Sequence, residues 1–513
     1  MKSVLRDALA VALKEFLPNA EAAGSWVGGQ LRSGDGEPIS LINPADGKTF
    51  MTYRDAGSTV VAEAARAAVA GQKAWSALTH AARGRLMQEI ARQVRTHQQL
   101  LAGLEAMSAG KPIRDCLGEV AKVAEMFEYY AGWTDKFHGE VIPVPTGHLN
   151  YTRREPVGVV LIITPWNAPV FTCGWNVAPA LAMGNAVLLK PSELTPLSSL
   201  AIAVLAERAG LPAGVLNVLA GYGHSTGQTA IAERGVNKVA FIGSPATGRS
   251  VATAAAARGV PCVLELGGKS ANIVFEDADL ERACVGAQAA IFAGAGQSCV
   301  AGSRLLVQRS IYDRFVAMVA QGARRLRVGE PMSTETEVGP IQNQRQYEHV
   351  LTMIRSGLND GAVLAEGSDG SPVESGYFVR PTVLRDVRNN MEVARTEVFG
   401  PVVVAIPFDT EEEAIEIAND TEFGLAGAVW TQDVARAHRV AAQVRAGTFW
   451  INSYKVINVA SPFGGYGASG YGRSSGIEVL HEYTQVKSVW VETASNPAAS
   501  FGYAPDGGRR AGS

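Results

Sequence analysis

The chain of 513 residues is too long for one hydrophobic core, and its length predicts roughly two to four domains. Its net charge of −3 lacks the basic surplus that nucleic acids and anionic membranes usually demand, so we expect neither as a partner. The sequence has no apolar run long enough to cross a bilayer. Residues 1–18 resemble an amphipathic helix without the apolar centre of a secretory signal, which predicts a cytoplasmic protein.

The cysteines are odd in number, widely spaced and free of any Cys-x-x-Cys pair: Cys116, Cys173, Cys262, Cys284 and Cys299. This pattern predicts neither a disulfide framework nor a zinc site. The 8 histidines have no ligand spacing, so no metal is expected. We expect packed thiols at 116, 262 and 284, whereas Cys173 follows closely on a candidate site motif.

Helices and strands alternate along the first half of the chain. Apolar spacing of three and four predicts paired helices over 59–110. Strands are then expected at 158–163, 186–190, 215–219, 239–242 and 263–266, with helices between them at 198–208 and 226–234. This alternation predicts a parallel sheet covered by helices on both faces, which is typical of nucleotide-binding α/β domains.

A second α/β unit is expected in the remainder of the chain. Its helices are predicted at 280–294, 311–326 and 343–359, and its strands at 304–307, 402–407 and 428–430. Two alternating strands, 141–154 and 484–492, fit neither unit, and we expect them to pair as an arm between subunits. The tail, 496–513, is rich in Gly, Pro, Ala and Arg and is expected to be disordered.

The glycine motifs of the chain are poor phosphate-loop candidates. Residues 465–470 match G-x-G-x-x-G literally, but no acidic residue follows at the required distance and no strand-to-helix unit frames them. Residues 221–227, which include Gly223, follow a predicted strand and open a helix, but contain one residue too many.

A better cofactor signal stands where a predicted strand ends, at Lys190-Pro191-Ser192-Glu193. A carboxylate placed there can accept hydrogen bonds from ribose hydroxyls and repel a 2′-phosphate, which favours NAD over NADP. The alternative is an ordinary helix start, with Ser192 as its cap. Residues 241–248, with Ser244 before a helix, would suit a pyrophosphate, although a simple glycine turn is an equal alternative.

Four further segments together provide the groups for covalent catalysis. Gly296-Gln297-Ser298-Cys299 places a thiol among small residues, where a substrate could reach it. The other three segments offer a carboxylate at Glu265, an amide at Asn167 and a second carboxylate at Glu397. The sequence thus predicts a nucleophile, a base and an oxyanion donor.

These segments, with 190–193, 241–248 and 462–465, resemble the aldehyde dehydrogenase superfamily in order and spacing from about residue 24 to residue 492. The resemblance implies an α/β fold with a Rossmann-like NAD-binding domain (6–133 and 155–266), a catalytic domain (267–465) and a small β oligomerisation arm (134–154 and 480–495). It also implies a homodimer or homotetramer. In this superfamily the cofactor domain lacks the standard glycine fingerprint, which accounts for the misleading match at 465–470.

The resemblance assigns roles residue by residue. It implies that Cys299 is the nucleophile, Glu265 the general base and Asn167 the oxyanion donor. Glu397 would bind the nicotinamide ribose, and Lys190 and Glu193 the adenosine ribose. The remaining residues implied to contact the cofactor are Ile163, Trp166, Ser192, Gly223, Phe241, Ser244, Leu266 and Phe399.

The substrate funnel implied by the same resemblance is mostly apolar, and it is formed by Phe171, Trp175, Phe292, Ser298, Val300, Lys455, Ile457 and Phe463. Such walls favour a medium-sized hydrophobic or aromatic aldehyde. If Lys455 points inward, an acidic semialdehyde is the alternative. Transfer of the acyl group to coenzyme A is less favoured, because enzymes of that kind generally lack the glutamate at position 265. The chain departs from the family pattern at Asn176 and Gly467, where many members have lysine.

Overall fold

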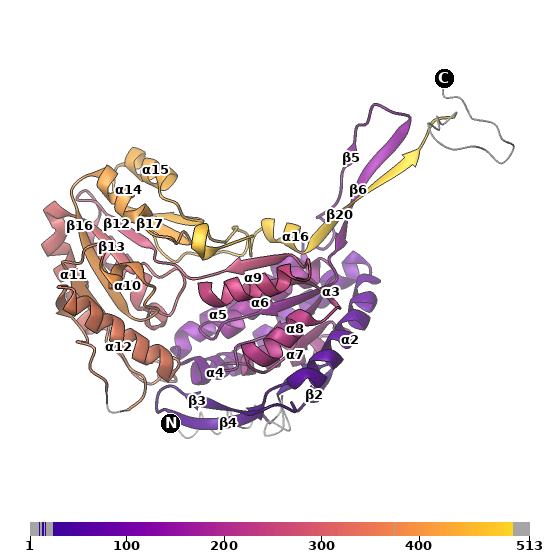
Figure 1. The fold of residues 1–513 in the computed structure, drawn as a ribbon, viewed down its shortest axis with the longest axis horizontal. Helices are drawn as coiled ribbons and strands as arrows, with labels where there is room; N and C mark the ends of the chain where they lie inside the picture. The colour runs from indigo at the N-terminus through magenta and orange to yellow at the C-terminus, as the bar shows by residue number, and fades with distance from the viewer. Residues whose placement is uncertain (1–9, 11–12, 15, 17–23, 374, 496–513) are drawn as a thin grey trace.

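Two α/β lobes and a projecting β arm make up the fold of the chain (Figure 1). The computed structural model describes residues 10, 13, 14, 16, 24–373 and 375–495. The predicted tail and most of the predicted N-terminal helix lie outside the described residues. Within the described part, no helix has the length and apolar character to cross a membrane.

The first lobe is built on an 8-stranded sheet with the order β19-β11-β10-β7-β8-β9-β1-β2. Its five parallel strands are those that the sequence predicts: β7 (Val159–Ile163), β8 (Ala186–Lys190), β9 (Leu216–Val218), β10 (Val236–Ile242) and β11 (Cys262–Glu265). Short antiparallel strands close both edges, namely β1 (Ser25–Val27) with β2 (Gln30–Arg32) at one and β19 (Gly470–Tyr471) at the other.

Successive residues of β7 point to opposite faces of this sheet, so each face has its own core. Val160 and Ile162 pack with one group of helices, whereas Val159, Leu161 and Ile163 pack with another. The first group comprises α3 (His80–Thr96), α4 (Gln98–Ala109), α5 (Ile113–Ala131), α6 (Pro169–Ala182) and α7 (Leu197–Arg208). The second comprises α2 (Gly57–Ser76), α8 (Gln228–Ala232) and α9 (Pro245–Ala256).

The two glycine-rich segments differ in their surroundings. Residues 465–470 form a 3₁₀ turn, η4 (Gly467–Ser469), and then edge strand β19, so no strand-to-helix unit frames them. Residues 223–227 form a π-helical turn, η1 (Gly223–Gly227), directly before α8. The helix predicted at 226–234 is therefore divided between two kinds of helix.

The second lobe contains a 7-stranded sheet with the order β14-β15-β16-β13-β12-β17-β18, parallel except where β14 meets β15. The strands are β12 (Ala271–Val274), β13 (Arg304–Gln308), β14 (Val363–Glu366), β15 (Thr382–Arg385), β16 (Val402–Phe408), β17 (Ala426–Trp430) and β18 (Thr448–Ile451). The helices are α10 (Leu280–Phe292), α11 (Tyr312–Arg325), α12 (Gln344–Asn359), α13 (Glu392–Arg395), α14 (Glu411–Asn419) and α15 (Val434–Gln443).

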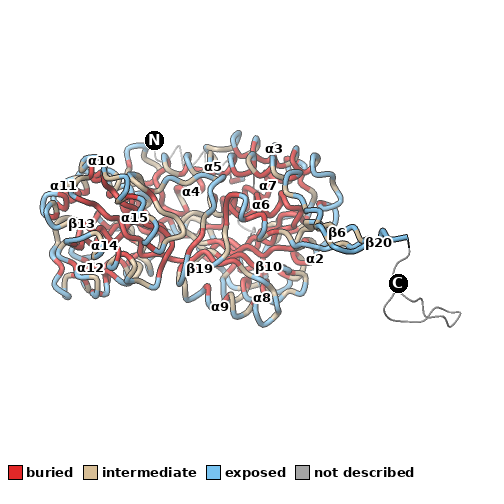
Figure 2. The backbone as a smooth tube through the Cα atoms, turned by 90° about the horizontal axis from the view of Figure 1, so that it is seen from above, coloured by how far each residue is buried: buried red, intermediate tan, exposed pale blue. Residues whose placement is uncertain are grey.

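Two smaller β structures stand outside the main sheets. β3 (Pro38–Asn43) and β4 (Lys48–Arg54) form a hairpin. β5 (Val141–Ile142), β6 (His148–Pro156) and β20 (Thr484–Glu492) form the arm, and α16 (Glu478–Glu482) precedes β20. β20 pairs antiparallel with β6 from Thr484–Pro156 to Glu492–His148, so the predicted pairing of these distant segments is confirmed. The arm is mostly exposed, whereas both lobes have buried centres (Figure 2).

Candidate active site

Cys299 lies in a tight turn that follows α10 and a 3₁₀ segment, η2 (Ala293–Gly296). The Ala301 amide closes the turn by donating to the Ser298 carbonyl at 3.0 Å. Gly296 has a φ of +70°, and a Cβ there would collide with the Gly400 carbonyl oxygen. Only glycine satisfies both conditions, and the contact packs the Glu397-to-Pro401 segment against the loop that carries the cysteine.

The Cys299 thiol is held in its protonated form at neutral pH. Burial is the main reason why its pKa is raised to about 12, and the charges of Glu397 and Glu265 act in the same direction. The Val300 amide and the Lys455 ammonium oppose this shift. A reactive thiolate therefore needs a base or an additional positive charge.

Glu265 is the last residue of β11 and is only 6% exposed. Neither carboxyl oxygen has a hydrogen-bond partner among the described residues. Burial raises the pKa of Glu265 to about 8, and Ser474 and Arg473 offset this only in part. A carboxyl group with free lone pairs and a pKa near neutrality is suited to taking a proton from water.

Asn167 is joined directly to the loop that carries Cys299. Its Nδ2 donates to the carbonyl oxygen of Gln297, two residues before Cys299, at 2.8 Å. An asparagine Nδ2 carries two hydrogens, so the second remains available to an oxygen bound beside Cys299. The structure thus brings together the amide and the thiol that the sequence predicts to cooperate.

Glu397 is half-buried, and it is fixed in place. Its Oε1 accepts the Gly268 amide at 2.9 Å, and a Cβ on Gly267 would collide with Oε2. Burial raises its pKa to about 7, against the effects of the Gly268 amide and Lys269. Trp166 meets Phe399 edge to face beside this carboxylate's segment, with ring centroids 5.3 Å apart.

The two residues of the predicted ribose clamp lie side by side at the end of β8. Lys190 is buried, and its Nζ lies 3.5 Å from Glu193 Oε2. Ser192 Oγ accepts the Leu194 amide at 3.3 Å and also lies 3.5 Å from Glu193 Oε2. The helix-capping alternative is wrong for this serine, because α7 begins at Leu197 and its N-cap residue is Pro196.

Two residues that support this clamp were missed by the sequence reasoning. The Tyr53 hydroxyl donates to the Glu193 carbonyl at 2.8 Å. Asp55 Oδ1 accepts the Tyr222 amide at 2.6 Å and the Thr226 hydroxyl at 3.0 Å, which holds the turn that contains Gly223. Both residues are more than a hundred positions from their partners, and no local pattern identifies them.

The other predicted cofactor residues lie along the same sheet edge. Ile163, Phe241 and Leu266 are nearly buried and share one apolar cluster. Ser244 caps α9, because its Oγ accepts the Thr247 amide at 3.3 Å. A Cβ on Gly223 would meet no atom within 4 Å, so this turn faces open space. The strand ends thus provide backbone amides and an apolar floor for a dinucleotide.

An aromatic wall stands beside the thiol. Phe171 and Trp175 stack with centroids 5.1 Å apart, and Trp175 meets Phe463 edge to face at 6.0 Å. Phe463 and Ile457 also pack against the small cluster that contains Cys299 and Val300. Ser298 is half-buried next to the thiol.

Two other predicted funnel residues, Phe292 and Lys455, do not belong to this aromatic wall. Phe292 is 1% exposed and packs in the core of the second lobe, apart from the Trp175 group. Lys455 has a φ of +57°, unusual for a residue with a side chain, and its Nζ donates to the Ala293 carbonyl at 3.4 Å. Burial lowers the pKa of Lys455 to about 8, while Cys299, Asp115 and Glu119 act to raise it.

Comparison with known proteins decides the family. Residues 31–489 match the Aldehyde dehydrogenase family. The chain belongs to this family. It is 44% identical over 462 residues to betaine aldehyde dehydrogenase of Mesorhizobium japonicum, covering 89% of this chain and 94% of that protein. It is 41% identical over 465 residues to retinal dehydrogenase 2 of Homo sapiens, covering 90% of each.

Solved aldehyde dehydrogenases have the same fold. An aldehyde dehydrogenase from Bacillus cereus in complex with NAD⁺ superposes with a TM-score of 0.91 at 42% identity, covering 94% of this chain and 99% of that one. PnpE in complex with nicotinamide adenine dinucleotide gives 0.91 at 42% identity, with the same coverage. The predicted family, fold class and nicotinamide cofactor are confirmed: the protein is an NAD(P)-dependent aldehyde dehydrogenase.

This aldehyde dehydrogenase departs from the family pattern at Asn176. The asparagine side chain is neutral and makes hydrogen bonds on both sides. Asn176 Nδ2 donates to the Thr172 carbonyl at 3.0 Å, and its Oδ1 accepts the Tyr483 hydroxyl at 3.4 Å. Nearby, Trp175 Nε1 donates to Ser474 Oγ at 2.9 Å. The hydrogen bonds around Trp175 and Asn176 therefore come from neutral donors.

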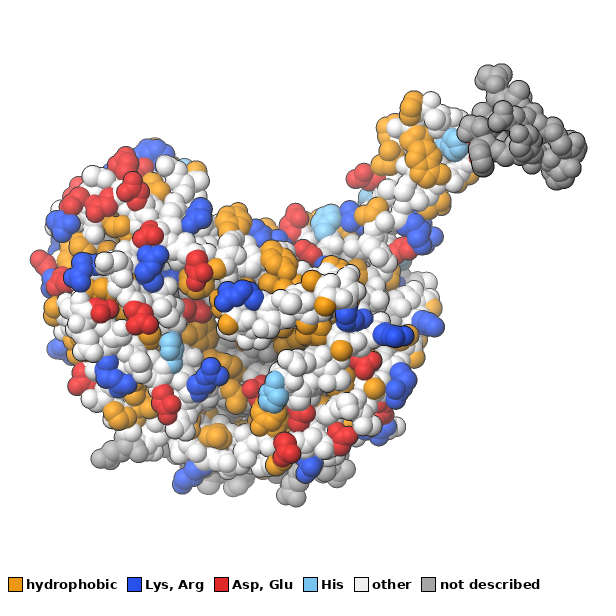
Figure 3. Space-filling model, in the orientation of Figure 1, with side chains coloured by type: hydrophobic (Ala, Val, Ile, Leu, Met, Phe, Trp, Pro, Cys, Tyr) orange, Lys and Arg blue, Asp and Glu red, His pale blue; other side chains and the backbone are white. Residues whose placement is uncertain are grey.

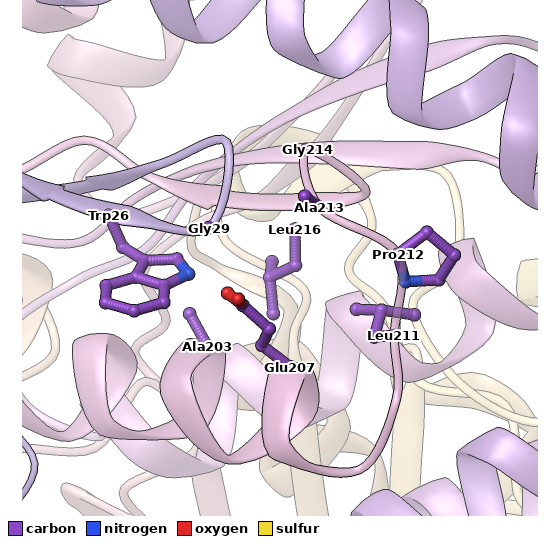
Figure 4. A pocket seen from close by; sticks show the side chains of 9 residues that line it. All are labelled: Trp26, Gly29, Ala203, Glu207, Leu211, Pro212, Ala213, Gly214 and Leu216. Carbon is purple, nitrogen blue, oxygen red and sulfur yellow. The ribbon is translucent and has the colours of Figure 1, made fainter.

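A small pocket lies elsewhere in the first lobe and shares no residue with the candidate site (Figure 4). Its lining consists of Trp26, Gly29, Ala203, Glu207, Leu211, Pro212, Ala213, Gly214 and Leu216. The Glu207 side chain points between Trp26 and Leu216, and a Cβ on Gly29 would lie 2.9 Å from its Oε1. This pocket belongs to the packing of β1 against α7.

Proposed function

We propose that this aldehyde dehydrogenase oxidises a medium-sized hydrophobic or aromatic aldehyde to the acid, with NAD, through a thioester on Cys299 that water hydrolyses. The observation that carries this proposal is the convergence of three groups: a thiol in a glycine-preceded turn, an amide tied to that turn, and an unpartnered buried carboxyl group. The thiol forms the bond to the aldehyde, the amide stabilises the oxyanion, and the carboxyl group activates water.

Once the Cys299 thiol has given up its proton to water, attack of the thiolate on the aldehyde carbon forms a carbon–sulfur bond and leaves a negative charge on the former carbonyl oxygen. The free hydrogen of Asn167 Nδ2 and the Cys299 amide are the donors for that oxygen. Loss of one such donor typically costs about 10²- to 10³-fold in turnover. Asn167 therefore acts when the charge develops.

Glu265 acts in the second half of the reaction. With both oxygens unpartnered, it can accept a proton from a water molecule as that water attacks the thioester carbon. The carbon–sulfur bond then breaks, and the acid leaves as Cys299 regains its thiol. Burial keeps the carboxyl pKa near the working pH, which a general base requires.

The residues at the sheet edge fit the dinucleotide by charge and shape. Lys190 and Glu193 would hold the adenosine ribose, and Glu397 the nicotinamide ribose. Bound NAD supplies the hydride acceptor for the oxidation step. The Glu193 carboxylate would repel a 2′-phosphate, which is our reason for preferring NAD to NADP.

The apolar wall favours the hydrophobic substrate class. Phe171, Trp175 and Phe463 form a continuous aromatic contact beside Cys299, with Ile457 packed against both groups. Each methylene that the substrate buries there adds about 0.8 kcal/mol to binding. The names of the relatives range from betaine aldehyde to retinal, so the wall is the stronger guide.

Lys455 supports a second candidate, an acidic semialdehyde. Its charge acts on Cys299, and its strained backbone keeps the side chain beside the η2 segment. A carboxylate of substrate would pair with this ammonium group. Asp115 and Glu119 already act on Lys455, and they weaken its attraction for a substrate anion.

Competition between benzaldehyde, hexanal and succinic semialdehyde tests the substrate class. We expect kcat/KM to be higher for the first two, and a preference above about tenfold for succinic semialdehyde would overturn the hydrophobic assignment. Lys455→Met is the matched variant: loss of a charge that acts on Cys299 should slow all three aldehydes, and loss of the partner for a substrate carboxylate should slow succinic semialdehyde the most. Running the assays with and without coenzyme A separates hydrolysis from thioester transfer.

The arm is our proposed contact with a second copy of the chain. Hydrophobic side chains gather on it (Figure 3), among them Val141, Leu149, Val486, Trp490 and Val491, all more than 40% exposed. A soluble monomer rarely leaves such a patch uncovered. Trp490→Glu should reduce the mass measured in solution, whereas Val434→Glu, at an even more exposed valine on α15, should not.

A further inference from the structure

Glu105 lies in α4, outside every motif of the family resemblance, and it is fully buried. A carboxylate is costly to bury unless hydrogen bonds and opposite charge compensate it. Here the partners come from two other helices. Oε1 accepts the Val170 amide at 3.0 Å, and Oε2 accepts the Ser198 hydroxyl at 2.8 Å.

Both partners lie in the first turn of a helix that has no side-chain cap of its own. The N-cap residue of α6 is Ala168 and that of α7 is Pro196, and neither makes a capping hydrogen bond. The first amides of a helix lack partners within it and carry partial positive charge. Glu105 thus supplies from α4 the negative cap that α6 lacks, and it holds the first turn of α7 through the Ser198 hydroxyl.

A nearby lysine balances the charge. Lys111 is buried, its Nζ lies 3.9 Å from Glu105 Oε1, and it forms an ion pair with Glu119 of α5. Burial raises the pKa of Glu105 to about 7, with Lys111 the largest opposing influence. The ion pair and the two hydrogen bonds account for the presence of a carboxylate in this core.

The start of α6 connects this cap to the reaction. Asn167 precedes the uncapped Ala168, and its Nδ2 donates to the Gln297 carbonyl. The end of α4 reaches the same loop by a second route: Gln342 donates to the Ser108 carbonyl at 3.1 Å, and its own amide donates to Gln297 Oε1 at 2.9 Å. α4 is therefore linked to both partners of the Asn167–Gln297 hydrogen bond. It reaches Asn167 through the start of α6, and it reaches Gln297 through Gln342.

We propose that Glu105 is a positioning residue that, by capping α6, fixes Asn167 against the Cys299 loop so that the second Nδ2 hydrogen points at the developing oxyanion. This inference rests on the proposed role of Asn167. A displacement of about 1 Å in such a donor can cost up to about 100-fold in rate. The expected consequence is a slower acylation step at unchanged affinity for NAD.

A double-mutant cycle with single-turnover kinetics tests the proposal. Glu105→Ala should lower the rate of NADH formation per titrated thiol by about 10- to 100-fold. In an Asn167→Ala background the same change should cost less than about twofold, because the residue through which Glu105 acts is gone. Equal losses in both backgrounds, or a per-site rate for Glu105→Ala within about twofold of the wild type, would overturn the proposal.

Two conservative variants keep the test decisive if Glu105→Ala does not fold. Glu105→Gln keeps an acceptor for the Val170 amide and should stay within about threefold of the wild-type rate. Glu105→Asp keeps the charge but withdraws it from that amide, so it should lose more than Glu105→Gln. The reverse order would contradict the capping role.

Thr79→Ala is the matched control. Thr79 caps α3, where its Oγ1 accepts the Ala82 amide at 3.2 Å, and its loss should destabilise the fold without changing the acylation rate. If Asn167→Ala itself left acylation unchanged, the proposed function of Asn167 would fail. A slow Asn167→Ala beside a normal Glu105→Ala would refute the positioning role alone.

Discussion

Two carboxyl groups, one buried and one half-buried, act on the pKa of Cys299, and they differ in how they are held. Glu265 ends a strand of the first lobe with both oxygens unpartnered, and burial raises its pKa to about 8. Glu397 belongs to the second lobe, and the Gly268 amide fixes one of its oxygens. An unpartnered carboxyl group can exchange protons with water, whereas a fixed one is suited to binding. The difference in hydrogen bonding therefore supports different roles.

The largest effect should come from removing the group on which both carboxyls act. Cys299→Ala should reduce dehydrogenase turnover below about 1% of the wild-type value, because no other thiol can form the thioester. Steady-state NADH formation measures this. Cys173→Ala is the control, since Cys173 is fully buried and burial raises its pKa to about 12. More than a few per cent of residual turnover would remove Cys299 from the mechanism.

Glu265→Gln should expose the difference between the two carboxyls. The amide cannot accept the proton of water, so hydrolysis should slow by about 10²- to 10⁴-fold while acylation continues. Rapid mixing should then show a burst of about one NADH per active subunit. Slow hydride transfer without a burst would contradict the role of base.

The pH profile should report the same group. Because the pKa of Glu265 is raised to about 8, the protonated form dominates at pH 6 to 7 and the base appears as pH rises. Hydrolysis should therefore increase by about tenfold per pH unit below the pKa and level off above it. Decay of the trapped acyl-enzyme gives this rate, and the slope should vanish in Glu265→Gln. A flat wild-type profile between pH 6 and 9 would exclude the assignment.

Glu397→Gln should behave in the opposite way. The amide keeps an oxygen for the Gly268 N–H but loses the charge, so we expect hydride transfer to slow by about tenfold with no burst. Single-turnover NADH formation measures it. If this variant also accumulated acyl-enzyme, the contrast between the two carboxyls would be lost.

The smallest effect concerns the choice of cofactor. Glu193→Ala and Glu193→Gln should both lower the ratio of kcat/KM for NAD over NADP by about tenfold, since both remove the charge that repels a 2′-phosphate. Agreement of the two variants would assign the effect to charge rather than to shape. An unchanged ratio would leave Ser192 and Glu193 as an ordinary turn before α7.

The parts of the site that the sequence predicted are those contained in short segments. Residue type and spacing identify Cys299 with Gly296, and Glu265 with Gly267 and Gly268. Lys190 and Glu193 do so by their place at a strand end. The five parallel strands of the first sheet were equally readable, because buried strands are apolar over their whole length. In the second sheet the sequence predicted β13, β16 and β17 but missed β12, β15 and β18, each of which is four residues long.

What the sequence by itself determined is the set of reactive groups, the order of the strands' segments along the chain and, through the family resemblance, the chemistry. Only the tertiary structure decided how these groups are held. Tyr53 and Asp55 support the cofactor turn, Gly296 packs on Gly400, and Glu105 caps the helix that follows Asn167. Each of these contacts joins residues that lie tens to more than a hundred positions apart. Local periodicity carries no information about such pairs, because chain topology and close packing bring them together.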